Sequence, residues 1–440
     1  MKIEGKSLKS DFLRFIIPSI IAQWVFTLYT MVDGLFVAKG VSEMALTAVN
    51  ISFPFVAGLF SISILFAVGT STVVAILMGE NKLKRANEVF TQNIIMLLVL
   101  SVIISVVVAL NLEEIALFLG ATEANLGYVK EYIGTIAPFA AAFVVSYSFE
   151  TLIKTDGYPK TATMIVIFGA LLNCVLDYVF VMVLHKGVFG AAFATGISQT
   201  AVIILYLRHF MGRCGTLRFA KFKWNLPLIW REFKNGLPSG ITEFSAGIII
   251  FFFNQAILRY INEDALVSYT IISYVNSIIV MSMAGVAQGY QPLISYYYGQ
   301  QRLDKCKKLL RYGLVAVVVL SVVSVAGSML GTKWIVSLFI SPELAELRAY
   351  SVQVFRIFSL SFAVVGFNVV IGGYFTAVEQ PISALTISIA RGLITMIVSL
   401  VILTSLFGGM GIWWAPTLSE GMCFAITLVL FFRYQKKNRL

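Results

Sequence analysis

The stretch Gly169-Ala-Leu-Leu-Asn-Cys-Val-Leu-Asp-Tyr-Val-Phe-Val181 places an amide and a carboxylate inside an otherwise apolar run. Asn173 and Asp177 are four residues apart, so a helix stacks both side chains on one face. The run from 162 to 184 is long enough to cross a bilayer. A lone ionised carboxylate there costs roughly 3 kcal/mol or more and is retained only with a partner or a water-filled pocket. The stretch therefore predicts a functional acid inside a membrane-spanning helix.

The composition supports a membrane protein. Of 440 residues, 59% are hydrophobic and 12% are charged, and the mean hydropathy is +0.88. Soluble proteins carry about 25% charged residues. The net charge is +11, but the basic residues fall in short clusters between apolar spans, where the positive-inside bias explains them. We expect an all-α polytopic protein whose surroundings are the lipid bilayer, and no nucleic-acid partner.

The cysteines and the N-terminus carry no sign of processing or cross-linking. The four cysteines show no CxxC or CxxH spacing, and each stands alone in or beside a different apolar span. We therefore expect no disulfide and no Cys/His metal site. Lysines precede a first apolar run that continues to Val37 without a cleavage-site pattern, which indicates a retained first span.

Apolar runs of about 20 residues or more predict about twelve membrane-spanning helices. The predicted spans are 12–37, 47–77, 90–111, 128–151, 162–184, 188–211, 233–260, 266–298, 309–331, 347–374, 382–405 and 410–432. Of the 33 Lys and Arg residues, 25 fall on the side that holds both termini and 6 on the other, while Arg356 and Arg391 lie within spans. This bias predicts that both termini are cytoplasmic, and we expect the inner membrane of a bacterium.

An almost gap-free internal repeat divides the chain. Pro18-Ser19 recurs as Pro238-Ser239 (238 − 18 = 220), and the Gly-x₉-Gly interval at 69–79 recurs at 289–299. We predict an N-terminal six-helix bundle (1–211), a cytoplasmic linker (212–232) and a C-terminal six-helix bundle (233–440). Because each bundle crosses the membrane an even number of times, the two have the same orientation and are expected to enclose a central cleft.

Four polar side chains are predicted to share one layer of the N-terminal bundle. At 1.5 Å per residue, Asp33, Asn173, Asp177 and Thr195 lie about 9 to 18 Å from the outer boundary. Such a layer can hold Na⁺ among oxygen ligands, or a proton between two carboxylates. The alternatives are that Asp33 caps a helix end and that Asp177 hydrogen-bonds a neighbouring backbone.

The repeat lacks both acids in its second copy. At the offset of 220 the counterpart of Asp33 is Phe253. At 222, the offset that matches Pro159 to Pro381 later in the chain, the counterparts of Asn173 and Asp177 are Thr395 and Ser399. Acids needed for a scaffold common to both bundles should occur in both. The asymmetry therefore predicts a coupling site in the N-terminal bundle only.

A second set of side chains is predicted to line the cleft. Glu243 and its repeat partner Gln23 keep a long polar side chain at the same place on the first helix of each bundle, where an acid can attract a cation; a structural hydrogen bond is the alternative. Flexible and aromatic side chains suit flat apolar ligands, although most such residues face lipid or core. The candidates of this kind are Met31, Tyr274 and Met283.

Two basic residues lie inside predicted spans, and an arginine at that depth requires a partner. We expect Arg391 to pair with Glu420 or with Glu379 as a structural tie. No partner is evident for Arg356.

The sequence resembles the multidrug and toxic compound extrusion (MATE) family, and within it the bacterial MepA-like branch. The resemblance extends over nearly the whole chain and is carried by Met31-Val-Asp-Gly-Leu-Phe-Val-Ala-Lys-Gly40, Lys154-Thr-Asp-Gly-Tyr-Pro159, Asn173-x-x-x-Asp177 and Gly187-Val-Phe-Gly-Ala-Ala-Phe-Ala-Thr195. It implies a twelve-helix antiporter that exports organic cations in exchange for H⁺ or Na⁺ and uses no other cofactor. It also implies that Asp33, Asn173, Asp177 and Thr195 form the coupling-cation site, and Na⁺ ligands if Na⁺ is the ion.

The resemblance is incomplete in the second half. A Glu on the seventh helix contributes to the cation site in the NorM branch, and Glu243 stands near that position. The Asp that the same branch carries on its tenth helix has no match in 347–374.

We expect a protein that functions as a monomer.

Three other functions are alternatives to antiport. A lipid-linked oligosaccharide flippase of related architecture would need a cleft rich in Arg and Lys. An integral membrane enzyme lacks its groups, because His185 and His209 lie at opposite membrane edges and no HExxH motif occurs. A channel is disfavoured because two lobes are expected to rock without a filter-like signature.

Overall fold

A computed structural model describes residues 7–212 and 214–437, which form helices and short connections without a strand. Twelve of the helical stretches are long and apolar enough to cross a membrane, as predicted. The chain is therefore an all-α, multi-pass membrane protein. Lys2, Lys6, Arg213 and Arg439, which belong to the basic side of the charge count, lie outside the described residues.

The first half runs from α1 to α8, and two of its spans are interrupted. The fourth span is broken by the 3₁₀ turn η1, and the fifth span ends in the π-helix η2. The elements are α1 (Leu8–Gly40), α2 (Glu43–Gly79), α3 (Leu83–Leu110), α4 (Leu112–Phe118), α5 (Leu126–Ile136), η1 (Ala137–Phe139), α6 (Ala140–Asp156), α7 (Pro159–Asp177), η2 (Tyr178–Val183) and α8 (Gly187–Met211).

The second half is interrupted at the corresponding spans, by a 3₁₀ turn in the tenth and a π-helix in the eleventh. Its first helix begins at Leu226, within the range 212–232 that the sequence assigned to the linker. The elements are α9 (Leu226–Tyr260), α10 (Asp264–Gly299), α11 (Leu303–Phe339), α12 (Ala345–Ser359), η3 (Leu360–Ala363), α13 (Val365–Ala377), α14 (Pro381–Ile389), η4 (Ala390–Ile394), α15 (Thr395–Phe407) and α16 (Gly409–Lys437).

Local sequence explains where several helices begin. The side chains of Ser7, Ser42 and Asn225 precede α1, α2 and α9, and each accepts a hydrogen bond from a backbone N–H of the first turn. The repeated prolines Pro159 and Pro381 each occupy the start of a helix, where the missing N–H is not needed. The repeat therefore preserves helix boundaries as well as apolar spans.

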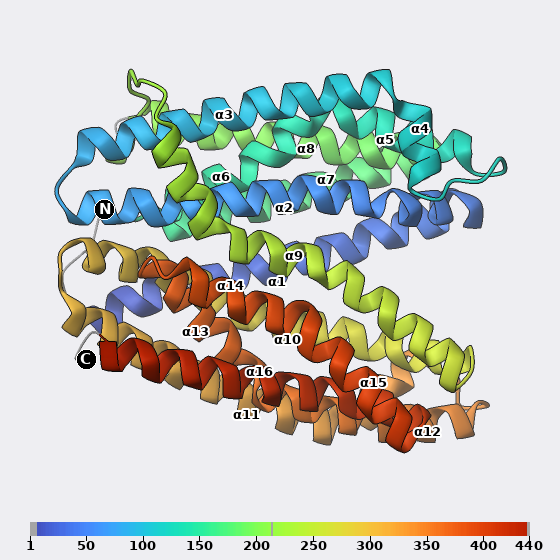
Figure 1. The fold of residues 1–440 in the computed structure, drawn as a ribbon. Coiled ribbons are helices and arrows are strands. Elements are labelled where there is room, and N and C mark those ends of the chain that lie inside the picture. The colour runs from blue at the N-terminus through green and yellow to red at the C-terminus, as the bar shows by residue number, and fades with distance from the viewer. Residues whose placement is uncertain (1–6, 213, 438–440) are drawn as a thin grey trace.

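The two halves lie side by side, and two long helices cross between them (Figure 1). The end of the bundle where α1 begins and α16 ends is called the terminal face, and the other end the opposite face. In Figure 1 the helix α9 starts beside the first half at the terminal face and finishes beside the second half at the opposite face, while α1 crosses in the reverse sense. Between the halves, α2 packs on α9, α1 on α10 and α2 on α10.

Glycines bring the halves into backbone contact near the terminal face. A Cβ on Gly79 would overlap the carbonyl of Tyr296, and a Cβ on Gly299 would overlap the carbonyl of Ile76. The two contacts are related by the 220-residue offset of the repeat, so they are pseudo-symmetric. The repeated Gly-x₉-Gly interval thus encodes close contact between α2 and α10.

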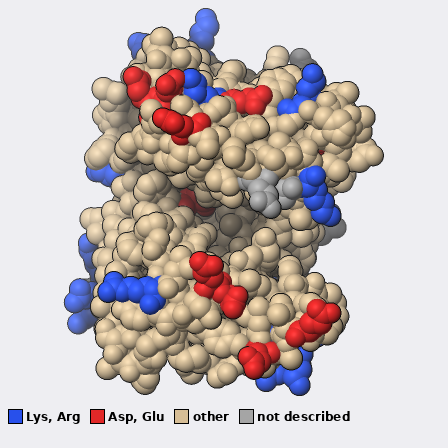
Figure 2. Space-filling model, turned by 90° about the vertical axis from the view of Figure 1, so that its right-hand side faces the viewer, with Lys and Arg blue, Asp and Glu red and all other residues tan. Residues whose placement is uncertain are grey.

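A second pair of contacts joins α2 to α9. A Cβ on Gly69 would overlap the carbonyl of Glu232, and a Cβ on Gly236 would overlap the carbonyl of Leu65. The halves are therefore closed on each other near the terminal face. At the opposite face, Figure 2 shows a hollow between the upper and lower halves of the molecule.

Candidate functional site

The two acids of the N-terminal bundle lie together. Asp33 comes from α1 and Asp177 is the last residue of α7, and their carboxyl groups are neighbours in the structure. Asp33 is not at a helix end, because α1 continues to Gly40. The helix-cap alternative for Asp33 is therefore excluded.

The oxygens of this site lack donors. Among the described residues, Asp33 Oδ1, Asn173 Oδ1 and both Oδ atoms of Asp177 are buried without a hydrogen-bond partner. Asp177 is 0% exposed and makes no bond to a neighbouring backbone, which excludes the second alternative. Burying like charges without compensation is costly, so this arrangement requires a proton or a cation.

Asn173 and Thr195 complete the predicted layer. The Asn173 Nδ2 atom donates to Thr195 Oγ1 at 3.3 Å, and the Thr195 hydroxyl donates to the carbonyl of Ala191 at 3.0 Å. The amide is thereby oriented, and its Oδ1 atom is left as an acceptor. Directly after Asp177 the chain widens into the π-helix η2, an irregularity frequent at functional sites.

Two tyrosines lie near the acids and a cavity adjoins Asn173 of the same layer, and sequence reasoning missed all three. Tyr29, one turn before Asp33 on the same face of α1, and Tyr132 of α5 both lie near Asp33 and Asp177. A cavity of about 50 Å³ is lined by Tyr29, Asn173 and Gln199 among others. It is large enough to hold water beside Asn173.

Glu150 and Lys154 form a buried ion pair beside this cavity. Lys154 Nζ donates to Glu150 Oε1 at 2.5 Å, and the two side chains are 3% and 11% exposed. Glu150 also lines the cavity. Their spacing of four residues was visible in the sequence, but Lys154 had been counted with the basic residues of the terminal face. Because Glu150 has a cation of its own, it does not replace Asp33 or Asp177 as an unpaired acid.

The predicted cleft residues Gln23 and Glu243 have different surroundings. Gln23 Nε2 donates to Gln288 Oε1 at 2.9 Å, which joins α1 to α10 across the two halves. Glu243 is half-buried on α9 and lies near Tyr147 of α6, a residue that lines the cavity. Glu243 of the second half is therefore close to the first half.

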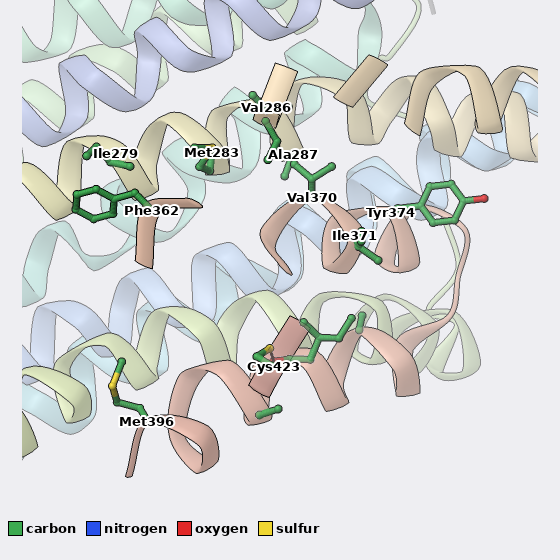
Figure 3. Close-up of a cluster of buried hydrophobic side chains, with 14 of the residues drawn as sticks. Ile279, Met283, Val286, Ala287, Phe362, Val370, Ile371, Tyr374, Met396 and Cys423 are labelled. Carbon is green, nitrogen blue, oxygen red and sulfur yellow. Dashed lines mark hydrogen bonds between the residues drawn. The ribbon is translucent and has the colours of Figure 1, made fainter. Parts of the chain in front are cut away.

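The prediction that Met283 lines the cleft is wrong for this structure. Met283 is 0% exposed and belongs to the hydrophobic core of the second half, with Ile279 and Phe362 (Figure 3). The reason is its position on the core-facing side of α10, one turn from Ile279. Tyr274 is 41% exposed, and its ring stacks on Phe339 of α11. Met31 is half-buried on α1.

The expected tie between Arg391 and Glu420 is confirmed. Arg391 Nε donates to Glu420 Oε1 at 2.9 Å, and Asn368 Nδ2 donates to Glu420 Oε2 at 2.8 Å. Glu379, the other expected partner, instead binds Arg231 through two hydrogen bonds of 2.7 Å. Arg391 is thus held within the second half by a neutralising acid.

The ligand atoms of the site suit a small cation. Among the residues that the structure describes, no three His, Cys, Asp or Glu side chains gather into a metal-binding group. Two carboxyl groups with an amide and a hydroxyl offer only oxygen ligands, which suit a proton or a hard alkali ion.

A profile of the family MatE matches residues 18–179 and 238–401, one segment in each half of the repeat. The chain belongs to the MatE family. It is therefore a membrane transporter and not an enzyme, as the resemblance implied.

Relatives and solved structures agree with membership of the MatE family. The chain is 25% identical to the multidrug export protein MepA of Staphylococcus haemolyticus, over 99% of this chain and 96% of that protein. It is 23% identical to the MepA of Staphylococcus aureus strain NCTC 8325, over 97% and 94%.

The fold is shared with solved MATE structures. One is described as the outward-facing conformation of a multidrug resistance MATE family transporter of the MOP superfamily, with a TM-score of 0.93, 21% identity and full coverage of both chains. Another is a MOP superfamily transporter from Pyrococcus furiosus described as having reverse polarity of the binding pocket, with a TM-score of 0.90, 22% identity and 98% coverage of both chains.

Proposed function

We propose that this MatE transporter exports organic cations by antiport with H⁺ or Na⁺, and that the layer formed by Asp33, Asn173, Asp177 and Thr195 binds the coupling ion. The observation that carries the proposal is the set of buried oxygens without donors on Asp33, Asn173 and Asp177. A site of this kind is stable only while a proton or cation occupies it. The name shared by the MepA relatives, multidrug export protein, supports the export of several compounds.

The coupling follows from the position of the acids. Asp33 lies on α1, and α1 packs on α7 of its own half and on α10 of the other. Neutralising the acids removes the repulsion between α1 and α7, which allows α1 to shift against α10. A change in α1 therefore reaches the contact between the halves, where a ligand with different affinities for two arrangements can shift their populations.

The cationic substrate is expected between the halves, near Glu243 and Gln23. Glu243 supplies a negative charge there, and tyrosines of the first half supply flat apolar surface and electron-rich ring faces for a cation. A flippase for pyrophosphate-linked lipids would need unpaired cations in this region. Lys154 and Arg391 are both paired with acids, which favours cation export.

We further propose that the terminal face is cytoplasmic, that the membrane is the bacterial inner membrane, and that a single chain transports. The basic bias of the terminal face supports the orientation. Both lobes of the transporter come from one chain, so the cleft is complete without a second copy.

The test is efflux of a fluorescent organic cation from proteoliposomes, under an imposed pH gradient and, separately, an imposed Na⁺ gradient. We expect at least one gradient to drive the dye against its own concentration gradient. Asp177→Asn should abolish this uphill transport while Asp304→Asn, which removes an exposed acid, should leave it intact. Dye movement that never runs uphill under either gradient would contradict antiport.

A further inference from the structure

Glu232 lies where the two halves meet near the terminal face. It is the seventh residue of α9, and its carbonyl is in contact with Gly69 of α2. The residue is 0% exposed. Glu232 is therefore enclosed by the contact between α2 and α9 and would be reached by water only if those helices separated.

No cation neutralises this carboxyl group. Among the described residues, neither Oε atom of Glu232 has a hydrogen-bond partner of good geometry. The Thr70 hydroxyl of α2 is near enough to interact with Glu232, and its own oxygen is likewise without a partner. A protonated carboxyl group could donate to that hydroxyl, whereas an ionised one would face it with a buried, uncompensated charge.

The neighbouring arginine is already bound elsewhere. Arg231 precedes Glu232 in α9, and its side chain is the charged group near the Glu232 carboxyl among the described residues. Its guanidinium is held by two hydrogen bonds of 2.7 Å to Glu379, in the connection between α13 and α14. Asn235 also donates to Glu379, at 2.8 Å. Arg231 thus stabilises Glu379 and leaves Glu232 without a counter-ion.

The other charged and titratable groups around this contact are also engaged. At the end of α2, Glu80 pairs with Lys82 at 2.7 Å. On α9, the Lys234 ammonium lies over the ring of Trp230, 5.2 Å from its centre. On α10, Tyr298 interacts with Arg231. Among the described residues, none of these groups forms an ion pair with Glu232.

We propose that Glu232 is a second proton-binding site, separate from the Asp33 and Asp177 layer, which holds a proton while α2 and α9 are in contact and releases it to water when they separate. The physical reason is the cost of burying an unpaired carboxylate, which is avoided by binding a proton. Once the interface opens, water solvates Glu232 and an ordinary glutamate ionises at neutral pH.

This proposal fixes the direction in which pH changes the population of the form that is closed at the terminal face. Closing the terminal face takes up one proton, so the closed form gains population as the pH on that side falls and loses it as the pH rises. One proton shifts the closed-to-open ratio by at most about tenfold per pH unit. The terminal gate would thus open more readily at alkaline pH, on the side from which we propose that substrates enter.

The test measures conformation by electron paramagnetic resonance distances. Spin labels are placed at Glu123→Cys and Glu343→Cys, exposed loop positions of the opposite face, one in each half, in a protein whose four native cysteines are replaced. Separation of the labels reports closure of the terminal face. The inference rests on the two-state transport proposed above, but the measurement needs neither substrate nor gradient, so it can fail while antiport holds.

The variants are Glu232→Gln and Glu232→Met, two neutral side chains of similar length, and the control is Asp304→Asn. We expect the closed-to-open ratio of the wild type and of the control to fall as the pH rises. Both Glu232 variants should lose the part of this dependence that Glu232 causes, which is up to about tenfold in the ratio per pH unit. The same pH dependence in wild type and variants would overturn the proposal, as would no pH dependence in the wild type. Failure of both variants to fold would also contradict it, because a site that holds a neutral acid should accept a neutral side chain.

Discussion

Gly236 of α9 gives a sharp test of how the halves close. A Cβ on Gly236 would overlap the carbonyl of Leu65 in α2 and lie 3.1 Å from the backbone nitrogen of Gly69. Both obstacles are backbone atoms, so no side-chain rotation relieves the clash. Overpacking of this kind costs about 1–3 kcal/mol, which corresponds to a change of about 5- to 150-fold in a conformational equilibrium. We expect Gly236→Ala to lower the closed population at the terminal face by a factor in this range.

The matched control is Gly247→Ala in the same helix. Nothing lies within 4 Å of a Cβ on Gly247, and alanine in a helix interior is favoured over glycine by about 1 kcal/mol. The control should therefore fold at least as well as the wild type with an unchanged conformation. The assay is the distance between labels at Glu123 and Glu343, which should shorten for Gly236→Ala alone. An unchanged distance in a folded Gly236→Ala, or an equal change in both variants, would refute the assignment of this contact as the gate.

Three further predictions concern the pairs, the cleft and the orientation. Arg391→Met leaves the acid of Glu420 without its cation and should lower the free energy of unfolding by about 3 kcal/mol, whereas Lys130→Met breaks an exposed pair and should leave thermal unfolding unchanged. Glu243→Gln removes an attraction of about 1.4 kcal/mol, a typical value for charges some 6 Å apart in a partly hydrated site. The variant should bind an organic cation about tenfold more weakly and a neutral ligand as tightly as the wild type. The exposed Cys214 should resist a membrane-impermeant thiol reagent in intact cells and react in inverted vesicles; labelling in intact cells would reverse the proposed orientation.

Much of the fold could be predicted because the membrane-spanning helices of a membrane protein are visible in its sequence as long apolar runs. The number of spans follows from hydropathy, and the repeat follows from residues such as Pro159 and Pro381, whose positions at helix starts are conserved between the halves. The acids Asp33 and Asp177 could be singled out because a charged residue in an apolar helix has few explanations. Their proximity depended on the packing of α1 on α7, which only the structure shows.

The least predictable feature was whether an apolar residue faces the lipid, the cleft or the protein core. In a membrane helix, both the lipid side and the core side are apolar, so periodicity separates them poorly. Met283 was therefore assigned to a cleft although it lies in the core. Glu232 was missed for a different reason: it precedes the seventh predicted span, where an acid ordinarily meets water. The backbone contact of α2 with α9 buries it, and that contact depends on glycines in two distant segments.

The central claim, that one acidic layer exchanges its ion for the exported cation, is tested most directly by binding to the purified protein. The affinity for an organic cation is measured across a range of pH and of Na⁺ concentration, for the wild type and Asp177→Asn. Competition through the layer predicts that wild-type affinity falls as protons or Na⁺ become more abundant, and that Asp177→Asn abolishes this dependence. A wild-type affinity indifferent to both ions, or the same ion dependence in folded Asp177→Asn, would contradict the account.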